Sequence, residues 1–183
     1  MRKWSREGAG PVFQRALSAA AQIPNASLRA RRLLQLAQQW QILDPPKGQE
    51  ILKTAEEEAR KRIHPSGQDE KMLTDIFLTR ARFDPAGVLT QAGKVASPSI
   101  QARVLLETAK ILQNASVEEN IKALEKALQF AQKKKDPRLT ANIALAWFSL
   151  EPAKGLEVLA QVEPKEIRAY TLRQMARQSF SLP

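Results

Sequence analysis

The sequence LDPPKG at residues 43–48 recurs in altered form as FDPAG at residues 83–87 and as LEPAKG at residues 150–155. A related capping pattern, SVEE at residues 116–119, lies between the second and third copies. The motifs are centred on positions 44, 84, 116 and 151, so the intervals between them are 40, 32 and 35 residues. Intervals of this size are typical of stacked helical hairpins.

The chemistry of these motifs predicts the end of one helix and the start of the next. Asp44 and Glu151 can cap a following helix whose first position is proline, and Ser116 has the spacing of a capping box with Glu119. The glycines at positions 48 and 155 are expected to let the paired helices approach closely.

A second pattern predicts the first helix of each hairpin, where a proline precedes an aliphatic residue, a variable residue and alanine. It occurs as LRA at 28–30, IQA at 100–102, LTA at 139–141 and IRA at 167–169. The two patterns together predict a first helix at 11–23, hairpins at 25–63, 68–95, 98–134 and 137–162, and a closing helix at 164–180. We therefore expect an all-α protein, a right-handed superhelix of about five stacked hairpins. Residues 11–183 would form one repeat domain after a flexible basic tail at residues 1–10.

The composition suits a helical domain with a real core. The chain has 183 residues, of which 43% are hydrophobic, and it has no cysteine, which excludes disulfides and thiolate chemistry. No apolar run approaches the roughly 20 residues that span a bilayer, so we expect a soluble protein. The apolar stretch at 12–23 contains Gln14 and Arg15, which favours an amphipathic helix over a signal peptide. We therefore favour a cytoplasmic location, with a leader that has already been removed as the alternative.

When the first and last motifs are superposed, Trp40 falls on Trp147 and Gly48 falls on Gly155. A tryptophan followed by a small residue early in the next helix resembles the tetratricopeptide and HEAT-like α-solenoid superfamily. The resemblance implies a binding scaffold in which the first helices of the hairpins line a groove. It supplies no functional residue of its own.

One helical face of residues 28–43 is a candidate binding surface. Steps of 100° place the apolar side chains from Ala30 to Trp40 on one side of the helix. The opposite side carries the long polar side chains, which are Arg31, Arg32, Gln35, Gln38 and Gln39. These residues can bind an anionic ligand, or they can form an ordinary solvated face.

Two arginines project on the apolar side of their helices. Arg29 is in line with Trp40, and Arg168 occupies the matching position of the last pattern. We interpret both as members of ion pairs with an acidic residue of a neighbouring helix, Glu157 or Glu163 for Arg168, with ligand binding as the alternative. The acidic run at 56–58 lies four residues before the basic run at 60–62, which predicts three pairs on a solvated helix.

The formal net charge of +10 points to acidic partners. We expect a non-enzymatic adaptor that binds an acidic or extended peptide segment of another protein, with nucleic-acid binding through dispersed basic residues as the alternative. The chain has one histidine, His64, and no glycine-rich phosphate loop or metal-ligand spacing, so we expect no catalytic residues, cofactor or metal. Trp4, in the basic tail, can stack on a base or pack on the first helix.

Overall fold

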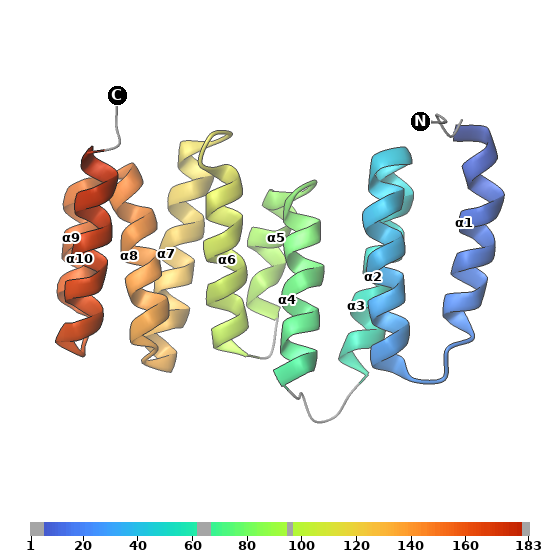
Figure 1. The fold of residues 1–183 in the computed structure, drawn as a ribbon, viewed down its shortest axis with the longest axis horizontal. Helices are drawn as coiled ribbons and strands as arrows, with labels where there is room; N and C mark the ends of the chain where they lie inside the picture. Colours follow the sequence, from blue (N-terminus) through green and yellow to red (C-terminus); the bar gives the residue numbers. More distant parts are fainter. Residues whose placement is uncertain (1–5, 62–66, 95–96, 181–183) are drawn as a thin grey trace. The chain divides into compact units, whose positions relative to one another are not determined.

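The computed structural model describes residues 6–61, 67–94 and 97–180. Every regular element in these residues is a helix, and no strand occurs among them (Figure 1). The all-α class is therefore confirmed. It follows from the abundance of Ala, Leu, Gln, Glu, Lys and Arg, which have the highest intrinsic helix propensities.

The helices match the predicted ranges at most of their ends. In chain order they are α1 (Arg6–Ala21), α2 (Ala26–Leu43), α3 (Pro45–Arg60), α4 (Gly67–Ala81), α5 (Pro85–Gln91), α6 (Pro98–Leu112), α7 (Val117–Lys134), α8 (Pro137–Leu150), α9 (Pro152–Ala160) and α10 (Lys165–Phe180), with a 3-10 turn η1 (Ala92–Lys94) after α5. None of the helices, within the described residues, is long and apolar enough to cross a membrane.

The chain divides into two compact units, residues 1–83 and residues 84–183. The first unit contains α1 to α4, and the second contains α5 to α10. The single repeat domain expected over residues 11–183 stays a prediction.

In the first unit, α2 packs on α3, α1 packs on α2, and α4 packs on both α2 and α3. Their shared core is built from aliphatic and alanine side chains, which are Ala30, Leu33, Leu34, Ala37, Ile51, Leu52, Ala55, Ala59, Met72, Leu73 and Ile76. Trp40 is buried in this core, and its ring lies 5.0 Å from that of Phe13 in α1. Trp40 is therefore a core residue, as its place on the apolar face predicts.

In the second unit, α6 packs on α7 and α8 packs on α9. Helix α8 also contacts α6, α7 and α10, which makes it the central helix of this unit. Its side chains Ile143 and Trp147 are buried together with Leu105, Leu124 and Met175 from the other helices. The two tryptophans at equivalent sequence positions thus have the same structural role.

Two of the three predicted helix caps form, at Asp44 and Ser116, and Asp84 caps α5 in the same way. The side chains of Asp44, Asp84 and Ser116 each accept a hydrogen bond from the backbone N–H three residues later, at 3.2, 2.8 and 3.3 Å respectively. Glu151 occupies the cap of α9 without a side-chain hydrogen bond, so the predicted cap is wrong there. Its side chain is one methylene longer than that of Asp, and Glu is not among the residues preferred at this position.

The glycines of the repeated motif allow close packing within two helix pairs. A Cβ atom at Gly48 would lie 2.5 Å from Cγ and 2.8 Å from the backbone nitrogen of Gln41. At Gly155 it would lie 2.6 Å from both the backbone nitrogen and the Cα of Phe148. Atoms that are not bonded do not approach this closely, so the predicted role of both glycines is confirmed.

Two helix ends differ from the prediction. Helix α1 begins at Arg6, within the segment 1–10 that was expected to be a flexible tail, because Pro11 lies inside the helix rather than at its start. Gly10 has no Cβ, which removes part of the clash that normally disfavours helix before proline. Helix α5 ends at Gln91 and passes into η1, so the second helix of the segment 68–95 is shorter than expected.

Replacing Gly155 by Ala tests the close approach of α8 and α9. The new methyl group must displace the backbone of Phe148, so we expect Gly155→Ala to lower the free energy of unfolding by about 1–3 kcal/mol, as overpacking does. Gly93→Ala in η1 is the matched control, since no atom lies within 4 Å of its new Cβ and its backbone φ is not positive. Denaturant unfolding should show Gly93→Ala as stable as the wild type or more so. Equal stability of the two variants would contradict the packing described here.

Candidate functional site

A groove between α2 and α4 collects several of the residues that the sequence marks as binding candidates. Its volume is about 540 Å³, within the range of ligand sites. We call it the α2–α4 groove. The described residues that line it are Arg31, Leu34, Gln35, Gln38, Lys71, Met72, Asp75, Leu78, Thr79 and Arg82.

The charge of the α2–α4 groove is positive. Arg31 from α2 and Lys71 and Arg82 at α4 are exposed cations, and Asp75 is the acidic residue among the lining side chains. Exposed cations at a concave surface attract carboxylates with little desolvation cost. The groove therefore has the electrostatics of a site for an acidic segment.

Polar and apolar side chains give the α2–α4 groove further binding chemistry. The Gln38 amide donates a hydrogen bond of 3.1 Å to the Thr79 hydroxyl, which in turn donates to the backbone carbonyl of Asp75 at 2.8 Å. These bonds tie α2 to α4 across the groove. Buried Leu34 and Met72 supply apolar contact surface.

Helical geometry explains which predicted residues reach the groove. Arg31, Gln35 and Gln38 are separated by four and three residues, so they lie on one face of α2. Arg32 and Gln39 are rotated away by about 80–100° and do not line the groove. Both are exposed, and Arg32 donates a hydrogen bond of 2.9 Å to the Gln35 amide oxygen.

The partners of this face on α4 were missed from the sequence. Lys71, Asp75 and Arg82 share a helical face through spacings of four and seven residues. That spacing was a usable signal, but the segment 68–95 departs from the repeat pattern at its start. Which helix faces α2 became clear only from the packing of α4 on it.

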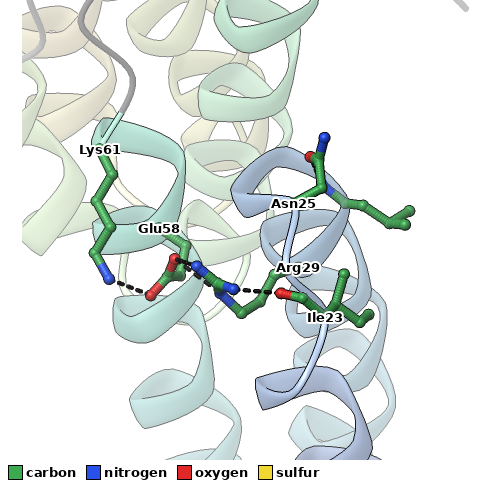
Figure 2. A network of polar contacts seen from close by, with 6 residues as sticks. Ile23, Asn25, Arg29, Glu58 and Lys61 are labelled. Carbon is green, nitrogen blue, oxygen red and sulfur yellow. Dashed lines mark hydrogen bonds and ion pairs between the residues drawn. The ribbon is translucent and has the colours of Figure 1, made fainter.

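Arg29 lies outside the groove and forms the ion pair that the sequence predicts. Its guanidinium donates to Glu58 Oε2 from Nε at 2.9 Å and from Nη2 at 2.6 Å, and to the backbone carbonyl of Ile23 (Figure 2). Lys61 donates to the second oxygen of Glu58. Glu58 is 9% exposed and Arg29 is half-buried, whereas Lys61 is exposed, so the network links α2 to α3 at the edge of the core. Arg29 thus has a structural role.

Arg168 is held less tightly. Its Nη1 lies 3.9 Å from Glu163 Oε1 and donates to the backbone carbonyl of Ala160 at 3.3 Å. Of the two predicted partners, Glu163 is therefore the one in contact. Glu157 instead accepts from Lys154 within α9, at 2.9 Å.

The acidic run of α3 holds helices together, contrary to its interpretation as a solvated face. Glu56 pairs with Arg60 at 2.7 Å, as predicted, and also with Arg80 of α4 at 2.9 Å. Glu58 pairs with Arg29 and Lys61, and its predicted partner at position 62 lies outside the described residues. The i, i+4 rule considers one helix, whereas these carboxylates face its neighbours.

Residues that could hold a metal are not gathered in the described ranges, where no group of three or more His, Cys, Asp or Glu side chains has suitable geometry. His64 and Trp4 lie outside the described residues.

Comparison with known proteins gave no match: no protein-family model, no curated protein and no solved structure matches this chain. The resemblance to the tetratricopeptide and HEAT-like superfamily therefore stays a prediction.

The Glu58 network predicts a pH dependence of stability. Hydrogen bonds from Lys61 and from Arg29 lower the pKa of Glu58 below its ordinary value, although burial opposes them. Because the folded pKa is below the unfolded one, this carboxylate stabilises the fold above about pH 4.3, and the contribution is lost as the pH falls through the folded value.

Glu58→Gln should lower the free energy of unfolding at pH 7 by about 1.5–3 kcal/mol, the range for hydrogen bonds to charged groups. The variant should also lose less free energy of unfolding than the wild type as the pH falls below about 4.3. Denaturant unfolding at several pH values measures this difference. Glu118→Gln is the control, since the pair of Glu118 with Lys122 is exposed and should add little. If Glu58→Gln were as stable as the wild type at pH 7, the claim that this network stabilises the fold would be wrong.

Proposed function

We propose that this protein is a non-enzymatic interaction scaffold that binds an acidic, extended segment of a partner protein in the α2–α4 groove. The observation that carries the proposal is the meeting of Arg31, Lys71 and Arg82 around one groove with amide and apolar side chains. Carboxylates of the partner would pair with the cations. Its main-chain groups would bond to Gln35 and Gln38.

The dimensions of the groove suit a short peptide. From Lys71 to Arg82 the axis of α4 rises by about 16 Å, at 1.5 Å per residue. An extended chain advances about 3.3 Å per residue, so about five residues span this length. Side chains of an extended peptide alternate between two sides, which would let acidic residues meet the cations while apolar residues contact Leu34 and Met72.

We also propose that the helices form a right-handed superhelix of about five hairpins, related to tetratricopeptide and HEAT-like repeats. The proposal is supported by equivalent local chemistry in both units. Gly48 and Gly155 permit close packing at the same point of their helix pairs, and Trp40 and Trp147 are buried at equivalent positions.

Nucleic-acid binding is the alternative, and the net charge of +10 favours it. The acidic Asp75 among the cations of the α2–α4 groove argues for a peptide instead. A phosphate backbone is uniformly anionic and would be repelled by this carboxylate, whereas a peptide can place a donor opposite it.

The test is a fluorescence-polarisation titration with a labelled six-residue peptide that alternates glutamate and leucine. We expect Arg31→Glu and Arg82→Glu each to weaken binding about tenfold, which corresponds to about 1.4 kcal/mol. Both residues are exposed, so the melting temperature should not change. Arg15→Glu in α1 is the matched control, because it makes the same charge change outside the groove.

Two results would contradict the proposal. One is peptide affinity that Arg31→Glu and Arg15→Glu reduce equally. The other is tight binding of a single-stranded oligonucleotide, falling steeply with salt, with no measurable binding of the peptide.

A further inference from the structure

A second cavity lies within the unit formed by residues 84–183. It is an open pocket lined by parts of α6, α7, α8 and α10, and its volume is about 310 Å³. We call it the α6–α8 pocket. The described residues that line it are Ala109, Lys110, Gln113, Asn120, Asn142, Leu145, Ala146, Ser149, Leu150 and Gln178.

Side-chain amides dominate the polar lining of the α6–α8 pocket. Gln113 at the end of α6, Asn120 in α7, Asn142 in α8 and Gln178 in α10 each contribute one. The cation among the lining residues, Lys110, pairs with Glu107 at 2.6 Å. The pocket is therefore close to neutral, in contrast to the α2–α4 groove.

Asn120 is the unusual member of this set. Its residue is 3% exposed, and its side chain forms no hydrogen bond with any other residue in the described part of the chain. By contrast, the hydroxyls of the buried residues Thr108 and Thr171 donate to backbone carbonyls at 2.8 and 2.9 Å. The amide atoms of Asn120 are not among the fully enclosed unpaired atoms of the described residues, so they open onto the pocket and are available to bond a ligand there.

The remaining surface of the pocket is apolar. Ala109, Leu145, Ala146 and Leu150 provide a wall of small and branched aliphatic side chains. The Ser149 hydroxyl donates to the backbone carbonyl of its own helix, at Leu145, and keeps its capacity to accept.

We propose that the α6–α8 pocket binds the main chain of an uncharged, extended peptide segment. A carboxamide donates and accepts hydrogen bonds in one plane, which matches the N–H and C=O groups of a peptide unit. Amides from several helices can therefore bond to successive peptide units, while the aliphatic wall receives one small apolar side chain. Phosphates and acidic side chains find no unpaired cation among the described lining residues.

This inference goes beyond the proposed function, because the site lies in the other unit and its chemistry does not depend on charge. A partner segment that meets it would be neutral where it binds. High salt should leave this binding unchanged while it weakens binding in the α2–α4 groove.

The experiment titrates acetyl-Ala-Leu-Ala N-methylamide, at millimolar concentration, into the ¹⁵N-labelled full chain. We expect the side-chain amide resonances of Asn120 and Asn142 to shift with saturation. A second probe, methylated on the leucine nitrogen, has lost one donor and should bind about tenfold more weakly. Absence of saturable shifts at these amides would overturn the proposal.

Substitutions in the α6–α8 pocket provide a second test of the proposal. Asn120→Leu keeps the size of the side chain and removes the unpaired amide, so it should leave the melting temperature unchanged or raise it while weakening probe binding about tenfold. Asn142→Ala, at an exposed position, tests the same site if Asn120→Leu fails to fold. Gln129→Ala, an exposed amide of α7 outside the pocket, is the control.

Probe binding that Asn142→Ala and Gln129→Ala affect equally would overturn the inference. Arg31→Glu should not change binding of the neutral probe. The experiment therefore tests the α6–α8 pocket separately from the peptide site proposed in the α2–α4 groove.

Discussion

The close approach of paired helices at Gly48 and Gly155 is the constraint on which the other features depend. A side chain at either position would collide with the backbone or side-chain stem of the preceding helix. Because α3 follows α2 after one capping residue, and α9 follows α8 in the same way, each helix has a fixed partner from the start. The next helices, α4 and α10, then pack against these pairs. The grooves form where side chains at such contacts leave space.

The two cavities differ in chemistry. The α2–α4 groove brings exposed cations beside an acidic residue, whereas the α6–α8 pocket gathers neutral amides around aliphatic side chains. Charged sites speed the association of oppositely charged partners, and their affinity depends on salt. Neutral amide sites select a ligand by the geometry of its hydrogen-bonding groups. A scaffold with both kinds of site would select a partner by two independent features. The ion pairs of Arg29 with Glu58 and of Arg80 with Glu56 meanwhile keep the helices of the first unit in register.

Much of the fold was predictable from the sequence because its signals are local. Caps, prolines and glycines fix where helices begin and end, and the burial of Trp40 followed from the period of apolar residues. The site was only partly predictable. Arg31, Gln35 and Gln38 lie on one helical face, but the contribution of Lys71 and Arg82 depends on which helix packs beside α2, and that is a tertiary property. The burial of Glu58 was missed for the same reason, since i, i+4 spacing describes one helix in isolation.

The most direct test of this account is a chemical-shift titration of the ¹⁵N-labelled full chain with the peptide that alternates glutamate and leucine. Backbone amides of residues 31–38 and 71–82 should shift together and saturate at one affinity. Shifts centred on another basic segment, such as Lys133 to Lys135 at the end of α7, would contradict the central claim, and so would small shifts spread evenly over all basic residues.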